Sequence, residues 1–220
     1  MVLHHTVAGV QSVNLGRATP AVYLKGRATG IDKRPVDHPV QVSAPGPKHV
    51  AGSGLAGDDV CNRRHHGGND QAVYAYARED LDRWALEFGG PLTSGSFGEN
   101  LTTHGIDISN SVLGERWAIG DELVLEVSDP RIPCRTFAGF LQQRGWVRRF
   151  SQQADPGTYL RVVTPGAMSA GDPITVVHRP DHGITVRTAF QAFTTDRTLL
   201  AQLVDVTSLS VEARTTVNNR

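Results

Sequence analysis

The stretch with the clearest chemical potential is a short connector that carries a thiol between two cations. It runs from Ser128 to Arg135 and contains Arg131, Cys134 and two prolines. The prolines restrict the backbone and remove amide donors, so the connector is expected to be stiff. A cation beside the thiol favours the thiolate, which attacks electrophiles or binds soft metals. The same residues also fit a buried cysteine in a strand-to-helix turn, with the arginines on the surface.

The sequence on either side predicts the elements that must position this connector. Apolar residues alternate over residues 123–127, which is typical of a half-buried strand. Apolar residues then recur at helical spacing over residues 137–141. The thiol is therefore expected where the chain leaves a sheet and enters a helix.

A second polar segment joins paired histidines to paired glycines. His65 and His66 precede Gly67 and Gly68, and such glycines allow positive φ or a close approach of the backbone. Exposed amides beside imidazole and guanidinium groups would suit an anion such as phosphate. Cys61 with the two histidines matches no standard zinc spacing, so no structural metal site is expected here.

Other polar side chains stand in a turn-rich segment and in predicted strands. Asn100 can donate and accept, and Glu99 could orient a partner, although such residues are also common in ordinary turns. Lys33 lies in an alternating stretch, where a solvated lysine of an edge strand is the simpler interpretation. Residues 158–163 predict a strand that places Tyr159 and Arg161 on one face.

Composition favours a β-rich protein without a general nucleic-acid-binding surface. The chain has 220 residues, 39% of them hydrophobic, with 22 basic and 22 acidic residues. Zero net charge argues against nucleic-acid binding through a broad basic field. The 23 glycines and 12 prolines fit many tight turns in a mainly β body with helices, an α+β fold class.

The sequence predicts a cytoplasmic protein with a free thiol. It has no apolar run near 18 residues, so no membrane-spanning helix is expected. Residues 1–5 lack the pattern of a signal peptide. Two cysteines, Cys61 and Cys134, do not make a disulfide framework.

A change of pattern near residue 180 predicts two parts. Residues 1–180 form the expected β-rich body, which includes one amphipathic helix over 78–88. Residues 181–220 read as short amphipathic helices, with Asp196 and Ser208 as candidate N-caps. So short a piece buries little apolar area alone, and it is expected to pack on the body or on a second subunit, which makes a homodimer plausible.

Four ordered motifs resemble the MOSC domain family, named for the C-terminal domain of molybdenum cofactor sulfurases. The similarity covers nearly the whole chain and extends to the stand-alone bacterial YiiM-like subgroup, whose C-terminal three-helix extension residues 181–220 resemble. The ordered set is far more specific than any one motif. The motifs lie at His66–Tyr74, Phe97–Leu101, Pro130–Cys134 and Gly157–Val162.

The resemblance implies a β-barrel body with a pocket for the molybdenum cofactor. Cys134 matches the family cysteine and would ligate molybdenum or carry sulfur, and Arg131 would hold the pterin phosphate or an oxo group. The remaining implied cofactor-binding residues are Lys33, which would pair with the phosphate, and His66, Asn100, Tyr159 and Arg161, which would line the pocket.

The subgroup implies reduction of N-hydroxylated bases such as 6-hydroxylaminopurine, a detoxification. The sequence contains no flavin, iron–sulfur or nicotinamide motif, so an external electron-donor reductase would be required. One alternative is a non-catalytic carrier of cofactor or sulfur, with a persulfide on Cys134. Another is an interaction module that docks through the helical tail.

Overall fold

The computed structural model describes residues 7–219, so the expectation on residues 1–5 lies outside the described residues. One large mixed sheet forms the body, with strand order β12-β8-β9-β10-β6-β7-β1-β4. Its pairs are antiparallel except for β6 with β7. The expected α+β class is confirmed. The bounds are β1 (Gly9–Gly16), β4 (Lys33–Val36), β6 (Val73–Ala77), β7 (Leu101–His104), β8 (Arg116–Ile119), β9 (Leu123–Pro130), β10 (Thr158–Thr164) and β12 (Ile174–His178).

The sheet curls without closing into a continuous barrel. The first half of β1 approaches the start of β12 through one bridge, Gly9 to Pro173, and Val10 N donates to Asp172 O at 2.9 Å. The second half of β1, from Val13 onward, pairs with β4 instead. The implied β-barrel body is therefore found as a curled sheet that does not close fully among the described strands, because β1 divides its outer edge between β4 and β12.

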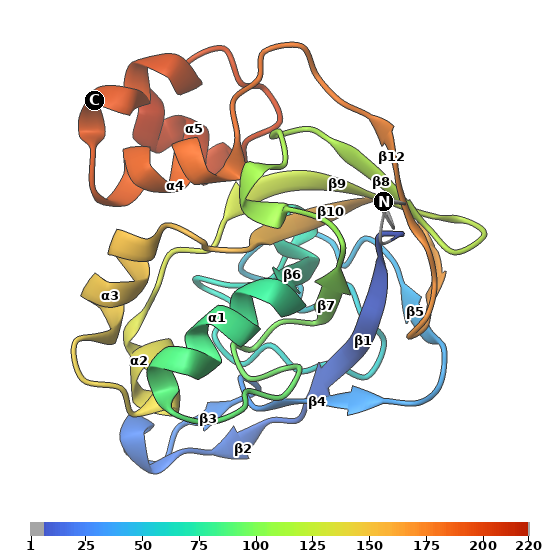
Figure 1. Ribbon diagram of the computed structural model, residues 1–220, viewed down its shortest axis with the longest axis vertical. Coiled ribbons are helices and arrows are strands. Elements are labelled where there is room, and N and C mark those ends of the chain that lie inside the picture. The colour runs from blue at the N-terminus through green and yellow to red at the C-terminus, as the bar shows by residue number, and fades with distance from the viewer. Residues whose placement is uncertain (1–6, 220) are drawn as a thin grey trace, which may run out of the picture.

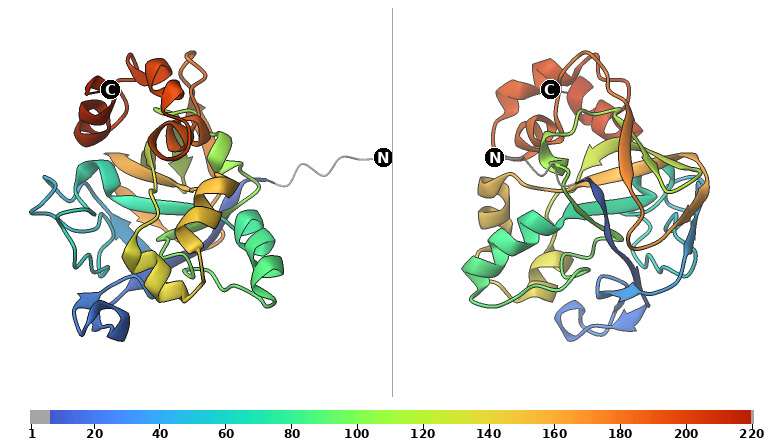
Figure 2. Two further views of the ribbon diagram at one scale, coloured as in Figure 1. Left: turned by 90° about the vertical axis from the view of Figure 1, so that its left-hand side faces the viewer. Right: turned by 45° about the vertical axis from the view of Figure 1, so that its right-hand side comes forward.

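Two smaller sheets extend the body. β5 (Val40–Val42) pairs with β11 (Gly166–Met168), and β2 (Thr19–Pro20) pairs with β3 (Ala28–Thr29). Between β2 and β3 runs the short helix η1 (Val22–Leu24). The β2–β3 hairpin lies at the end of the molecule opposite the C-terminal helices in Figures 1 and 2.

Three helices pack around an aromatic cluster beside the sheet. They are α1 (Arg78–Phe88), α2 (Arg135–Leu141) and α3 (Trp146–Gln153) (Figure 1). The predicted amphipathic helix over 78–88 is confirmed, and it buries Trp84 against Phe97, Trp146 and Phe150. The expected strand, connector and helix around Cys134 are also confirmed, since β9 ends at Pro130 and α2 begins at Arg135.

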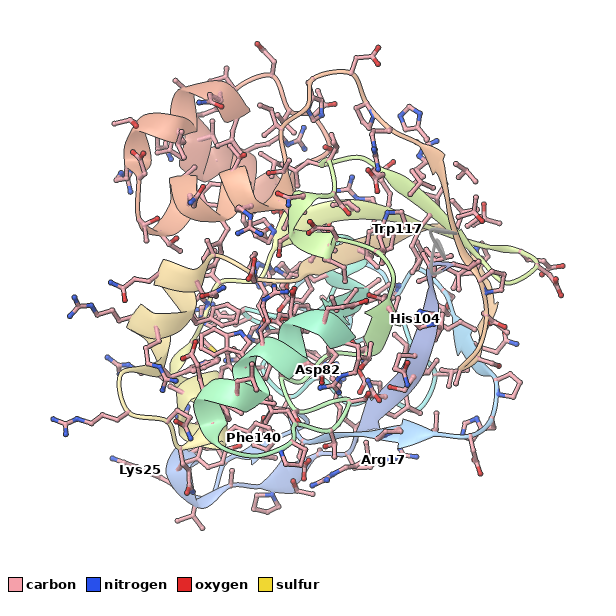
Figure 3. All side chains as sticks on the ribbon, in the orientation of Figure 1. Arg17, Lys25, Asp82, His104, Trp117 and Phe140 are labelled. Atoms are coloured by element: carbon pink, nitrogen blue, oxygen red, sulfur yellow. The ribbon has the colours of Figure 1, made fainter. Side chains whose placement is uncertain are left out.

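The C-terminal segment is helical and packs on the body. It contains α4 (Val186–Thr194), η4 (Arg197–Leu203) and α5 (Val211–Asn218). Except for Phe190, which joins the aromatic cluster, its buried apolar residues belong to the same core as Trp117 of β8, which Figure 3 labels. Asp196 caps η4 as expected, whereas α5 is capped by Ser210 rather than Ser208. The division near residue 180 stays a prediction.

Short helices complete the described chain: η2 (Asn69–Gln71) precedes β6, and η3 (Ile108–Asn110) follows β7. From residue 7 to residue 219, no helix is both long and apolar enough to cross a membrane.

Candidate functional site

A cavity of about 520 Å³ opens beside the proline-containing connector. The β2–β3 hairpin, the start of β4, residues 53–71 and the connector contribute to its walls. The structure brings six of the seven sequence-predicted site residues to this one cavity. They are Lys33, His66, Asn100, Arg131, Cys134 and Tyr159.

Arg131 is the most deeply buried cation of the cavity, with an exposed fraction of 4%. Its guanidinium carbon lies 4.6 Å from the ring centre of Tyr74 and 4.3 Å from that of Phe137. Nη1 donates to Phe97 O, while Nε has no hydrogen-bond partner among residues 7–219. The guanidinium places a positive charge at the cavity wall, which is suited to an anion.

The backbone beside Arg131 needs glycine. Gly98 has a φ of +73°, and a Cβ there would lie 2.9 Å from a side-chain carbon of Ile31 and 3.5 Å from Nη1 of Arg131. This explains the glycine of the Phe97–Leu101 motif, since a side chain would displace the wall that supports the guanidinium.

Lys33 is held inside the cavity by an acidic partner. Its exposed fraction is 7%, and its ammonium forms an ion pair with the carboxylate of Asp58. The interpretation of Lys33 as a solvated edge-strand lysine is therefore wrong, although β4 is an edge strand. Burial lowers the pKa of Lys33, and the negative charge of Asp58 opposes that effect.

Asn100 connects this ion pair to the sheet. Its amide Nδ2 donates to Asp58 at 2.9 Å, and its Oδ1 accepts from Tyr74 N at 3.3 Å. Glu99 points elsewhere: its fully buried carboxylate accepts from the amides of Gly95 and Phe97. Glu99 therefore orders its own turn, which is one of the two roles that the sequence left open.

Two free thiols line the same cavity. Cys134 is half-buried at the end of the connector, and its Sγ accepts from Phe137 N at 3.5 Å as the N-cap of α2. Cys61 is exposed and reaches the cavity from the loop before the histidines. Sequence reasoning named Cys134 and assigned no role in the pocket to Cys61.

His66 and Tyr159 form an uncharged pair on the wall. His66 Nδ1 lies 3.2 Å from Tyr159 Oη. Burial, with a smaller effect of Arg131, lowers the pKa of His66 to about 3, and burial raises the pKa of Tyr159 to about 12.

Gly67, with a φ of +84°, fits against Gly52, whose oxygen would lie 2.6 Å from an added Cβ. Glycine is needed at position 67 because two backbone segments pack closely there.

Arg161 does not line the cavity. Its guanidinium contacts Asp70 at 2.8 Å and Glu126 at 2.8 Å, and it donates to Ser208 O at 2.7 Å. These two acidic neighbours draw the side chain toward the C-terminal segment, so Arg161 joins β10 to that segment. The prediction that Arg161 closes the pocket wall is corrected accordingly.

Sequence reasoning missed Asp58, which lies behind the cavity wall, and Gln71, which lines it. Asp58 accepts from Gly16 N at 2.8 Å in addition to Lys33 and Asn100. Gln71 lines the cavity, and its Oε1 is buried without a partner among the described residues. The only sequence signal at Asp58 was a glycine-rich turn, which gives no information on a partner.

The side chains of this cavity fit an anionic group that accepts several hydrogen bonds and contains a metal to which one thiolate can bind. No cluster of three or more His, Cys, Asp or Glu side chains suited to a metal ion occurs within residues 7–219. Cys134 would therefore be the single protein ligand beside the cations Lys33 and Arg131. Such a set suits a metal that arrives with its own ligands, as the molybdenum cofactor does.

The sequence matches one protein family and is similar to several known proteins. The sequence matches the MOSC domain family over residues 62–175. It is 35% identical over 181 residues to YflK of Bacillus subtilis, covering 82% of this chain and 78% of that protein. It is 31% identical over 160 residues to YiiM of Escherichia coli, covering 71% and 67%. It is also 30% identical over 139 residues to a protein of Gibberella moniliformis named a reductase, covering 61% of this chain but 24% of that one.

The fold has a close solved counterpart. The crystal structure of YiiM from Geobacillus stearothermophilus superposes with a TM-score of 0.76 at 26% identity. The match covers 96% of this chain and 98% of that one, so it includes both the sheet and the C-terminal helices.

Proposed function

Because the chain belongs to the MOSC domain family, we propose that it binds the molybdenum cofactor and reduces N-hydroxylated bases or related compounds. The observation that carries this proposal is the meeting of Arg131, Lys33 and the thiol of Cys134 on one cavity of about 520 Å³. The reductase name of the fungal relative supports the reaction class. The protein is proposed to act in the cytoplasm, in keeping with its free thiols.

The cations would hold the anionic part of the cofactor. Arg131 offers a planar array of donors, which suits a phosphate or an oxo group. Lys33 would share its charge between Asp58 and the incoming anion. The buried position of Arg131 strengthens such contacts, because little water competes for them.

Cys134 would ligate the metal. A soft thiolate is a suitable ligand for a sulfur-ligated transition metal. When bound, molybdenum supplies the redox chemistry that breaks the N–O bond of the substrate. The protein's own contribution is to orient the cofactor and to present polar groups at the wall.

His66 and Tyr159 would assist at the reacting oxygen. Both rings are uncharged at neutral pH, given pKa values of about 3 for His66 and about 12 for Tyr159. Tyr159 therefore keeps its proton on Oη, where it donates a hydrogen bond to an acceptor in the cavity or to His66. This arrangement would stabilise the departing oxygen until it leaves as water.

The electrons would come from a separate reductase. The overall reaction converts an N-hydroxylated amine to the amine and water, and consumes two electrons and two protons. The sequence has no flavin, iron–sulfur or nicotinamide motif to supply those electrons. The donor would have to reach the cavity from outside, past the exposed Cys61 side or across the connector.

A sulfur or cofactor carrier is the second candidate function. Cys61 lines the same cavity as Cys134, and this second thiol favours it. A persulfide on Cys134 could pass its outer sulfur to a thiolate, a transfer that restores the Cys134 thiol. The carrier would bind cofactor or sulfur without turnover.

Turnover by cofactor-loaded protein separates the two functions. The protein, purified from a host that makes the cofactor, is supplied with a chemically reduced viologen and 6-hydroxylaminopurine, and the formation of adenine is followed. Reduction by the wild type and its loss in Cys134→Ala would support the reductase. Stoichiometric cofactor with no reduction would refute the reductase and favour the carrier.

A further inference from the structure

A second hollow, of about 370 Å³, adjoins the first cavity. Both are lined by His66, Gln71, Cys134 and Tyr159, so these four residues stand at the boundary between them. The second hollow lies toward the C-terminal segment, because α4 and α5 contribute to its walls. Cys134 therefore borders both hollows.

The walls of the second hollow are largely apolar. Ile132 and Pro133 of the connector lie on one side, and Phe193 of α4 and Ala213 of α5 contribute from the C-terminal segment. Its volume is within the range of small-molecule sites, about 300–1,000 Å³. Apolar and aromatic side chains of this kind can pack against the faces of a planar heterocycle.

One buried carboxylate gives the hollow a specific polar feature. Asp129 of β9 lines it with an exposed fraction of 6%, and its Oδ1 accepts from Ser210 N at 3.1 Å. A carboxylate carries about four acceptor sites, so contact with Ser210 leaves capacity for a ligand. It would accept N–H donors at the edge of a heterocycle.

An ion pair stands at the same hollow. Lys48 and Glu212 both line it, and their charged groups are 3.5 Å apart. Glu212 is 48% exposed, so the pair contributes little to stability and separates readily. A ligand could enter by displacing this contact without disturbing the core.

We propose that the second hollow is the substrate site and takes a planar nitrogen heterocycle with N–H donors at its edge. This rests on the proposed function: the cofactor fills the first cavity, and the N-hydroxyl group reaches the shared boundary at Cys134. There the N–O bond breaks, the oxygen leaves as water, and the nitrogen keeps its bond to the heterocycle. The external reductase supplies two electrons, and solvent supplies two protons.

Two threonines of α5 give a matched pair of variants for a test of the site. Thr216 lines the second hollow, whereas its neighbour Thr215 lines neither cavity. Both are exposed, so tryptophan at either position leaves the core intact. Binding of 6-hydroxylaminopurine is measured by calorimetry, with adenine as an unreactive probe, alongside pterin content. Thr216→Trp is expected to raise both dissociation constants by at least about tenfold. Thr215→Trp should change them less than about twofold, and pterin content should stay unchanged in both.

A second variant tests the polar contact. Asp129→Asn keeps an oxygen for Ser210 N but turns part of the acceptor edge into a donor. It is expected to weaken adenine binding relative to hypoxanthine, which carries an oxo group in place of the amine.

The outcomes separate this inference from the proposed reaction. Wild-type affinity in Thr216→Trp, or an unchanged adenine preference in Asp129→Asn, would overturn the substrate site even if loaded protein reduces the base. Base binding that Thr216→Trp abolishes would support the site even if no reduction occurs, and then the proposed reaction alone would fail.

Discussion

The ammonium of Lys33, a residue of the cavity wall, lies against the carboxylate of Asp58, and their side chains are 8% and 0% exposed. Asp58 also accepts from Gly16 N and Asn100 Nδ2, so the carboxylate is fixed from several sides. The lysine is thereby held at the start of β4 as part of a buried network. An anion entering the cavity meets a cation whose charge is already partly balanced.

Removing either partner of this ion pair should be destabilising, and the two losses should not add in the double variant. Lys33→Met leaves a buried carboxylate without its cation, and Asp58→Asn leaves a buried ammonium without its anion. Each is expected to lower the free energy of unfolding by about 3–5 kcal/mol, while the double variant loses less than the sum. Urea unfolding of the four proteins measures the coupling, and purely additive effects would show that the pair is not coupled.

Replacement of Arg131 should remove the anion-binding wall while a neighbouring arginine serves as control. Arg131→Met is expected to lower pterin content by at least about tenfold, since one good charge-assisted contact is worth about 1.5–3 kcal/mol. Arg135 is exposed in the same connector, so Arg135→Met should retain the pterin. Pterin is released from each purified protein and quantified by fluorescence. Equal pterin in both variants would remove Arg131 from the binding site.

His66 should make the protein less stable in acid. Its pKa is about 3 in the folded state, below the usual value of about 6.5, so the unfolded chain binds more protons between these values. The stability associated with neutral His66 is thus complete above about pH 6.5 and is lost as the pH falls toward 3. His66→Gln should reduce the dependence of the unfolding free energy on pH in this range, whereas replacement of the exposed His65 should not. Urea unfolding across pH tests this, and parallel curves for all three proteins would contradict it.

Asp80 should make the protein less stable as the pH rises, which is opposite to the effect of His66. Burial, reinforced by the charge of Asp155, raises its pKa to about 7. The folded state therefore binds more protons than the unfolded chain between about pH 4 and 7, and stability falls as the pH rises through that window. The wild type should lose on the order of 2 kcal/mol of unfolding free energy across this pH window, and Asp80→Asn should not show that loss. Asp82, exposed on the same helix (Figure 3), provides the control Asp82→Asn, for which the wild-type slope is expected. Unfolding free energies at about pH 5 and 8 measure the difference.

The fold was largely predictable where periodicity is strong. The alternation over 123–127 and the helical spacing over 78–88 both gave the correct element. Closure of the sheet was not predictable in this way, because it depends on how β1 divides its edge between β4 and β12. The cap of α5 was misplaced by two residues, since Ser208 and Ser210 have the same capping chemistry.

The sequence predicted six of the residues that line the cavity, but it predicted few of the contacts that their side chains make. Lys33 has an alternating neighbourhood that reads as a solvated strand, and only its tertiary partner Asp58 makes it a buried ion. Arg161 follows Tyr159 at the spacing of one strand face, yet acidic neighbours from distant segments draw it away from the cavity. Such partners are far apart in sequence, and local patterns carry no information on them.

Metal content of cysteine variants tests the central proposal most directly. The wild type, Cys134→Ala and Cys61→Ala are purified from a cofactor-competent host, and molybdenum and pterin are measured per protein. We expect stoichiometric molybdenum in the wild type and in Cys61→Ala, with at least about a tenfold loss in Cys134→Ala. Full molybdenum in Cys134→Ala would contradict a thiolate ligand at this position.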